Sequence, residues 1–183
     1  MLERLLIEHG APTLARIKVG NLIQTAVPDP ARFDAELASL TRRLASKGVA
    51  LTVLKRCSAG ALVYVYRPQK LAEALARPEI AAFLSDAGYG DLSIGAALAT
   101  LSSHLTCGEA FPHEIGVFLG YPLEDVLAFI RHRGQGCGLC GCWKAYHNLP
   151  EAARIFALYD RCRRIYTRLH TGGRSLEQLT VAA

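Results

Sequence analysis

Two strand-forming segments that lie close together in the chain constrain the fold more than any other feature. Residues 49–55 and 61–66 are rich in Val, Leu and Tyr, which favour extended backbone. The tetrapeptide 57–60, Cys-Ser-Ala-Gly, separates them and has the length and composition of a hairpin loop. The two segments are therefore predicted to pair as antiparallel strands.

Two further segments show strand patterns. In residues 13–23 the apolar positions 15, 17 and 19 alternate with Arg16 and Lys18. Because successive side chains of a strand point to opposite faces, this segment is predicted to bury one face and to present Arg16 and Lys18 together on the other. Residues 142–146 are predicted as a last strand.

Proline and glycine mark the ends of most predicted helices. Asp29 and Pro30 form a capping and first-turn pair, and apolar residues recur at helical spacing from Phe33 to Leu44 before Gly48. The first helix, residues 2–9, is predicted to stop at Gly10 and Pro12. Further helices are predicted at residues 68–76, 78–87, 91–105, 112–119, 122–133 and 151–170. The glycine-rich residues 131–141 are predicted to form a loop.

These elements predict an α+β fold with a single small, mainly antiparallel sheet of about four strands packed against a majority of helices. The chain has 183 residues, of which 51% are hydrophobic, and no repeat or linker divides it. A single domain over residues 1–183 is predicted, with the tail after about residue 171 frayed.

The N-terminal residues and the apolar segments exclude two classes of protein. The first ten residues carry Glu3 and Glu8 and lack the basic start and long apolar middle of a secretory signal. No apolar run approaches the roughly 18 residues that a spanning helix needs, so no membrane is expected as a partner. The protein is therefore predicted to be cytoplasmic, with its cysteines as thiols, metal ligands or redox groups.

Three of the six cysteines form the densest candidate site. Cys137, Cys140 and Cys142 lie within six residues, and the two-residue gap between the first pair lets both thiolates reach one tetrahedral metal. No second CxxC motif is present, so a further ligand must come from elsewhere in the chain. A redox-active thiol pair and ordinary loop thiols are the alternatives.

Two further cysteines lie elsewhere in the chain. Cys57, beside Arg56, is a minor candidate for a reactive thiol, and Cys162 is predicted to be a buried core residue.

His113 and Glu114 follow Phe111-Pro112 at the start of a predicted helix. Glu114 in a first turn is favoured by the exposed backbone amides, so capping explains it without further function. Alternatively, His113 is a metal or haem ligand or a general base, with Glu114 orienting it or acting beside it as a second catalytic residue.

Several cations fall on predicted strands or at their ends. If these strands share one sheet, Lys18, Arg56, Arg67 and Lys144 converge on one face and bind an anionic small molecule or cofactor; a solvent-facing sheet surface is the alternative. The net charge of +5 is concentrated near the C-terminus, in what is predicted as a solvated helix face. Nucleic acid stays an alternative partner, without a recognisable binding motif.

Five motifs carry a resemblance to a known family. They are HGAPTLA at 9–15, KRC at 55–57, ALVYVYR at 61–67, FPHEIGVFLGYP at 111–122 and CGCWKAY at 140–146. The chain resembles the uncharacterised bacterial domain of unknown function 3793 family, common in anaerobes, over nearly its whole length. In the family pattern a cysteine often stands at Gly10 and a non-cysteine aromatic at Cys142. The resemblance implies no established activity, and the association of some members with flavodoxin-like or iron-transport genes favours redox or metal handling.

The leading hypothesis is a protein that handles a metal or redox cofactor, namely iron, a haem-like group or zinc. Cys137, Cys140, Cys142 and His113 are its predicted metal ligands, and the basic face takes an anionic group. One alternative is an enzyme acting on an anionic substrate with His113 and Glu114 as acid–base residues and Lys18 as the anion clamp. Another is a regulatory module that contacts nucleic acid or an acidic partner. The sequence leaves open whether the protein is an enzyme and what its oligomeric state is.

Overall fold

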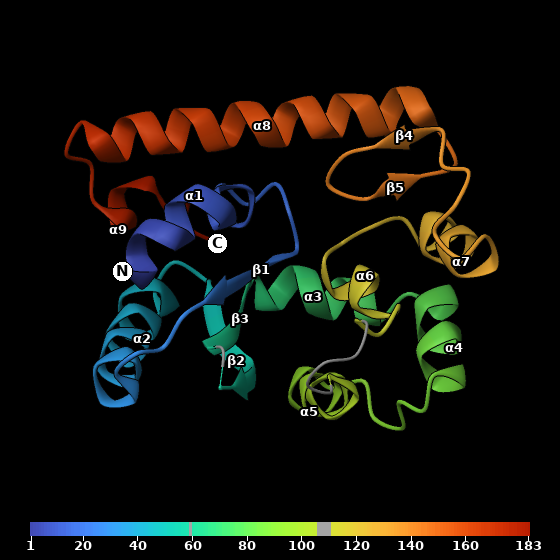
Figure 1. Ribbon diagram of the computed structural model, residues 1–183, viewed down its shortest axis with the longest axis horizontal. Helices are drawn as coiled ribbons and strands as arrows, with labels where there is room; N and C mark the ends of the chain where they lie inside the picture. The colour runs from blue at the N-terminus through green and yellow to red at the C-terminus, as the bar shows by residue number, and fades with distance from the viewer. Residues whose placement is uncertain (59, 106–110) are drawn as a thin grey trace.

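A computed structural model describes residues 1–58, 60–105 and 111–183, with helices surrounding a small central sheet (Figure 1). The sheet has the strand order β1-β3-β2 and is antiparallel throughout, with β1 at Gly20–Thr25, β2 at Ala50–Cys57 and β3 at Gly60–Tyr66. A separate two-stranded hairpin joins β4, Leu139–Cys140, to β5, Lys144–Ala145. The predicted α+β class with a small antiparallel sheet is confirmed.

The predicted pairing of the two strand-forming segments is confirmed by the register of β2 and β3. Val53 lies opposite Val63, and a bulge follows between Val53 and Lys55. Ala59, in the predicted loop, lies outside the described residues. Since β3 is the central strand, it is covered on both faces, and Val63, Tyr64 and Val65 are fully buried. This explains why its sequence is a continuous apolar run rather than an alternating one.

The long helices α1, Leu2–Leu14, α2, Pro30–Ala45, and α8, Leu149–Thr171, form one part of the helical layer. Asp29 caps α2 as predicted, because its side chain accepts a hydrogen bond of 3.0 Å from the backbone N–H of Arg32. The shorter helices are α3, Pro68–Leu75; α4, Pro78–Asp86; α5, Ile94–His104; α6, Ile115–Phe118; α7, Leu123–Arg131; and α9, Leu176–Leu179. Among the described residues, no helix is long and apolar enough to cross a membrane.

The apolar side chains of the described residues gather in three clusters. One joins Tyr64 and Tyr66 of the sheet to α3, α4, α5 and α6, and a second joins Val63 and Val65, on the opposite sheet face, to α1, α2 and α9. The third packs Trp143 and the β4–β5 hairpin against the N-terminal half of α8. Helix α8 runs along one side of the molecule, from the hairpin at one end to α1 and α9 at the other (Figure 1).

The predicted boundary between the first helix and the first strand is wrong. Helix α1 continues through Gly10 and Pro12 to Leu14, and β1 begins only at Gly20. Gly10 is tolerated because α1 packs closely on the sheet: a Cβ there would lie 3.3 Å from a methyl carbon of Val65. The intervening residues form a turn in which the predicted alternation fails, since Arg16 is exposed and Lys18 is buried.

Two predictions near the C-terminus also need correction. The predicted strand at residues 142–146 shrinks to the two residues of β5, while the predicted loop at 131–141 contains β4. The tail is packed rather than frayed, because α9 buries Leu176 and Leu179. Ser175 and Gln178 form a capping box at its start, which gives this short helix a defined N-terminus.

Candidate functional site

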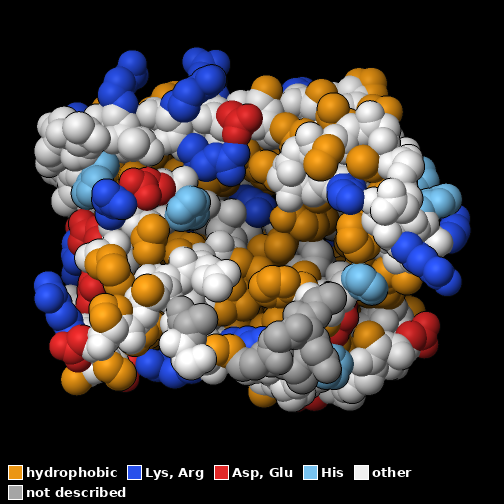
Figure 2. Space-filling view, in the orientation of Figure 1, with side chains coloured by type: hydrophobic (Ala, Val, Ile, Leu, Met, Phe, Trp, Pro, Cys, Tyr) orange, Lys and Arg blue, Asp and Glu red, His pale blue; other side chains and the backbone are white. Residues whose placement is uncertain are grey.

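Helices α6 and α7 and the β4–β5 hairpin enclose a pocket of about 460 Å³. Most of its wall is apolar or aromatic, provided by Phe111, Ile115, Tyr121, Val126, Phe129 and Trp143. His113, Asp125, Cys140 and Lys144 supply the polar and thiol groups. Hydrophobic side chains gather on the face of the molecule that carries α6 and the hairpin (Figure 2). Such a combination of an apolar wall and a few polar groups is typical of sites for small molecules and cofactors.

A buried carboxylate joins the two sides of the pocket. Asp125, in the first turn of α7, is 3% exposed, and its Oδ2 accepts a hydrogen bond of 2.8 Å from the indole N–H of Trp143. Its Oδ1 accepts bonds of 2.9 Å from the backbone N–H groups of Tyr146 and His147. Burial by itself raises the pKa of Asp125, but the hydrogen bonds outweigh it, so the pKa lies below its ordinary value. Asp125 therefore fixes the hairpin rather than offering a free carboxylate to a ligand.

The orientation of Trp143 depends on close contacts behind the hairpin. Its ring packs edge-on against Phe156 of α8, with centroids 4.5 Å apart, and lies 5.3 Å from the ring of Tyr121. Gly141 permits this approach, because a Cβ at that position would lie 2.2 Å from the Phe156 ring. The indole is thereby held as a rigid wall of the pocket.

The four predicted metal ligands separate into two groups. His113 and Cys140 are exposed and both line the pocket, where the His113 ring lies 5.5 Å from that of Phe129. Cys137 and Cys142 are half-buried and lie outside the pocket lining. Among the described residues, no three His, Cys, Asp or Glu side chains lie close enough together to hold a metal ion. The four residues therefore do not form one site.

The remaining cysteines have other roles. Cys162 is buried on α8, in line with its prediction as a core residue, and burial raises the pKa of its thiol to about 11. Cys57 is disulfide-bonded and so offers no free thiol. Cys107 lies outside the described residues.

The carboxylate of Glu114 pairs with His104 and Tyr89 rather than with His113. The side chain of Glu114 is 11% exposed, and its Oε1 lies 2.6 Å from Nδ1 of His104 and 3.4 Å from the hydroxyl of Tyr89, which donates to it. The predicted catalytic group of Lys18, His113 and Glu114 is therefore not assembled, since only His113 lines the pocket. His104 was missed as the partner of Glu114, because their contact depends on how α5 packs and no local pattern signals it.

A family model described as protein of unknown function (DUF3793) matches residues 6–180. The chain belongs to this family. The match includes every element that forms the pocket. No curated protein and no solved structure matches the chain, so the functional argument rests on geometry.

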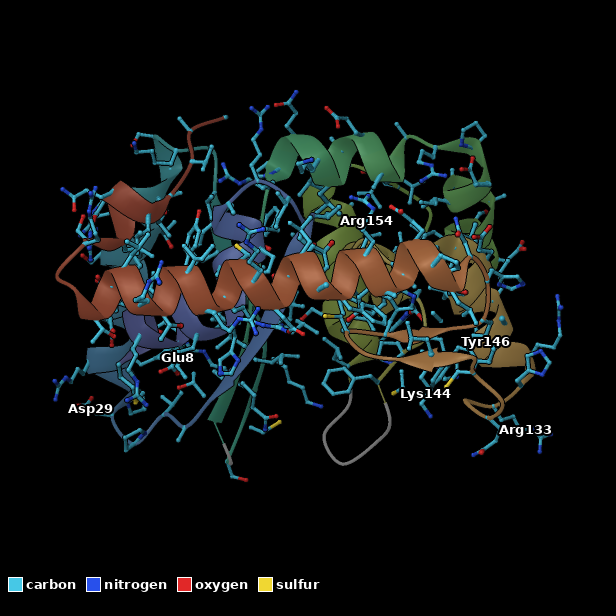
Figure 3. The ribbon with its side chains drawn as sticks, turned by 90° about the horizontal axis from the view of Figure 1, so that it is seen from above. Glu8, Asp29, Arg133, Lys144, Tyr146 and Arg154 are labelled. Atoms are coloured by element: carbon cyan, nitrogen blue, oxygen red, sulfur yellow. The ribbon has the colours of Figure 1, made fainter. Side chains whose placement is uncertain are left out.

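The predicted cationic site of this DUF3793 protein is dispersed. Arg67 is 2% exposed and donates hydrogen bonds of 2.6 to 2.9 Å to four backbone carbonyls, which makes it structural. Arg56 pairs with Asp34 at the surface. Lys144 lies on β5, on the side of the hairpin away from α8 (Figure 3), and its ammonium donates to the carbonyl of Gly134 at 2.7 Å. Of these cations only Lys144 lines the pocket.

Lys18 occupies a different environment from the other cations of the DUF3793 chain. It is 6% exposed, and its Nζ lies 5.3 Å from the ring centroid of Tyr121 and 5.7 Å from that of Tyr159. Burial lowers the pKa of Lys18 to about 8. The half-buried Cys142 and Arg163 also lie close enough to Lys18 to affect its pKa.

Proposed function

We propose that this protein binds a small molecule with a flat, mainly apolar body in the pocket between α6, α7 and the β4–β5 hairpin. The observation that carries the proposal is the pocket itself: about 460 Å³ with an aromatic wall and few polar groups. Its volume lies within the range of roughly 300–1,000 Å³ that is usual for small-molecule sites. The aromatic side chains of Phe129 and Trp143 suit a ligand with a planar ring system.

The polar groups of the wall favour a ligand with one polar or anionic edge. Lys144 donates one hydrogen bond to Gly134 and keeps further N–H donors, and the exposed His113 offers its imidazole. Asp125 has its carboxylate oxygens occupied by the hairpin. A ligand carboxylate or phosphate at the rim would therefore meet donors and no free buried carboxylate.

A metal-containing or redox cofactor is the second candidate for this pocket, and one observation favours it. His113 and Cys140 both line this pocket, so the imidazole and the thiol would be the two side chains available there to hold iron, a haem-like group or zinc. An enzymatic reaction on an anionic substrate would use His113 as the proton-transferring group, without Glu114, whose carboxylate pairs with His104.

The first experiment asks what the protein carries when it is isolated. Purification without oxygen, followed by native mass spectrometry, elemental analysis and a visible absorption spectrum, identifies a retained organic or metal cofactor. A visible band or stoichiometric iron or zinc that is lost in His113→Ala and Cys140→Ser supports the cofactor candidate. A metal-free, colourless protein that takes up neither iron, zinc nor haem contradicts it.

The second experiment uses the chain's single tryptophan, because Trp143 lies in the pocket wall. Anilinonaphthalene sulfonate, a flat apolar probe with one anionic group, should bind and quench Trp143 fluorescence. The variants Ile115→Phe, which fills the pocket, and Lys144→Met, which removes its cation, should each weaken binding by about tenfold, equivalent to about 1.4 kcal/mol. His9→Ala, at an exposed position on α1, serves as the matched control. Equal affinity in all four proteins, with unchanged circular dichroism, would contradict binding in this pocket.

A further inference from the structure

A buried lysine that pairs with no carboxylate among the described residues lies beside the pocket. Lys18 stands in the turn between α1 and β1, and its side chain is almost completely removed from solvent. Among residues 1–58, 60–105 and 111–183, no carboxylate forms an ion pair with its Nζ, which reaches solvent only at its tip. The rings of Tyr121 and Tyr159 provide only the weaker attraction of aromatic faces.

A second cation lies next to Lys18. Arg163, on α8, donates a hydrogen bond to the carboxylate of Asp160 and lies close enough to Cys142 and Lys18 to interact with both electrostatically. Cys142 in turn lies close to Lys18. Asp160 is more than half exposed, so its carboxylate faces solvent and leaves Lys18 without a negative partner. Lys18 and Arg163 thus approach Cys142 from two different elements, the α1–β1 turn and α8.

An uncompensated buried charge is costly, because water no longer solvates it. Burial lowers the pKa of Lys18 only to about 8, so the ammonium form still predominates at neutral pH. Asp125 and Arg67, by contrast, each form several hydrogen bonds within the protein. A bound anion would give Lys18 the negative partner that the described part of the chain does not provide.

We propose that Lys18, Arg163 and Cys142 form a binding site for a small oxyanion, the carboxylate or phosphate group of a ligand. The ammonium and the guanidinium both donate charge-assisted hydrogen bonds to such a group, and the thiol of Cys142 adds a weak donor. Tyr121 belongs to both sites, since it lines the pocket and lies against Lys18. Figure 2 shows a basic side chain at the back of a hollow in the middle of this face. The anion site does not depend on the pocket being occupied.

Isothermal titration with inorganic phosphate and with acetate, at constant ionic strength set with sodium chloride, tests the site. Wild-type protein should bind at least one of the two anions, and that anion should raise its melting temperature above that in sodium chloride alone. Preference for phosphate or for acetate identifies which oxyanion the site takes. In Lys18→Met and Arg163→Gln the dissociation constant should rise at least about tenfold, as expected for losing one charge-assisted bond.

The control is Arg164→Gln, which removes the same charge from the neighbouring, exposed position of α8 and should leave binding unchanged. Failure of both anions to bind the wild type overturns the proposal, as does equal binding by wild type and Arg163→Gln. Since Arg163 is only partly buried, its variant tests the site independently of any change in stability that Lys18→Met causes. If the wild-type protein binds phosphate but not anilinonaphthalene sulfonate, the proposed function is overturned and the anion site stands.

Discussion

Three buried ionisable residues differ in how the protein compensates their charge. The guanidinium of Arg67 is surrounded by four carbonyl oxygens, and the carboxylate of Asp125 accepts bonds from two backbone N–H groups and an indole. The ammonium of Lys18 lies near two aromatic rings, the thiol of Cys142 and the guanidinium of Arg163, and it has no carboxylate partner among the described residues. Since an unsatisfied buried charge destabilises a fold, Lys18 should lower stability in the absence of a ligand, whereas the other two residues should raise it.

The charge of Lys18 predicts an unusual dependence of stability on pH. The pKa falls from 10.5 in the unfolded chain to about 8 in the folded protein, so the unfolded chain binds more protons between these values. The destabilisation is therefore fully present below pH 8 and is relieved as the pH rises toward 10.5. Lys18→Met should be more stable than wild type by up to about 3 kcal/mol at neutral pH, and the difference should shrink in alkaline solution.

The measurement is urea unfolding of wild type and Lys18→Met between pH 7 and pH 10.5, in buffers without phosphate or carboxylate. The groups that face Lys18, namely Tyr121, Tyr159, Cys142 and Arg163, are common to both proteins, so the difference between the two curves isolates the lysine. If the difference in unfolding free energy between the two proteins does not change with pH, the pKa of Lys18 is not lowered by burial.

Replacing Asp125 by Asn should destabilise the β4–β5 hairpin. The amide keeps the size of the carboxylate but loses one acceptor oxygen, so at least one of the N–H groups of Trp143, Tyr146 and His147 is left unpaired. A loss of about 2–3 kcal/mol is expected in chemical unfolding, as for hydrogen bonds to a charged group. Trp143 fluorescence should report the hairpin directly. Glu124→Gln, at the preceding position of α7, provides the matched control.

The pH dependence of Asp125 should have the opposite sign to that of Lys18. Its folded pKa lies below the ordinary value, so its stabilisation is complete above the unfolded pKa of about 3.9 and is lost as the pH falls through the folded value. Wild type should therefore lose more stability than Asp125→Asn on acidification below about pH 4. Parallel acid unfolding curves for the two proteins would contradict this assignment.

At the scale of elements, local signals in the sequence predicted the start of α2 and the central hairpin, whereas α5 and α6 each begin three residues later than predicted. Asp29 and the run 61–66 carry their structural information in adjacent residues, so both predictions succeeded. The extent of α1 depends instead on its packing against β3. The helix passes close to Val65 at Gly10, so a residue without a side chain fits there and does not end the helix. The error at this boundary also misplaced Lys18, which an alternating strand would have exposed beside Arg16.

The candidate site was predictable only in part for the same reason. His113 and Cys140 were both singled out by residue type, and the structure brings them to one pocket. Two other contacts depend on packing alone. Glu114, before α6, meets His104 at the end of α5, and Lys18, in the α1–β1 turn, meets Arg163 of α8, which is distant in the sequence. Residue types identify such groups, but only the packing of the helices determines which of them meet.

Arg67 connects the ends of several elements, and its replacement should loosen all of them. Its guanidinium bonds the carbonyls of Thr13 and Leu14 at the end of α1, of Lys47 after α2, and of Val181 in the tail. Arg67→Met leaves these buried acceptors without their donors and should cost about 3–5 kcal/mol in the free energy of unfolding. Arg67→Lys should recover only part of this loss, because an ammonium has three donors and lacks the planar geometry.

Equilibrium unfolding of the two variants, compared with Arg77→Met, provides the measurement. Arg77 forms a surface ion pair with Glu79, so its loss should change stability by less than about 1 kcal/mol. If Arg67 instead held an anionic cofactor, its replacement would weaken ligand binding with little effect on stability.

At the scale of the whole molecule, the C-terminal tail closes the cluster that joins α1, α2 and the sheet. Leu176 and Leu179 are buried there, the N–H of Val181 donates to the carbonyl of Leu14 at 3.1 Å, and Glu177 pairs with Arg43 of α2. The chain therefore returns to its own beginning after α8 has crossed the molecule (Figure 1). The tail is part of the core despite its position at the end of the chain.

Deletion of residues 175–183 should consequently destabilise the protein rather than remove an inert segment. Loss of two buried leucines costs about 2 kcal/mol each, and Arg67 loses one acceptor, so a decrease of about 4–6 kcal/mol is expected. Deletion of residues 182–183 alone, which are exposed, should have little effect. Thermal unfolding and the rate of proteolysis within α1 distinguish the two truncations, because α1 loses its cover only in the longer one. Equal stability of both would show that α9 does not contribute to the core, and the cluster would then have to be held by α1 and α2 against the sheet without it.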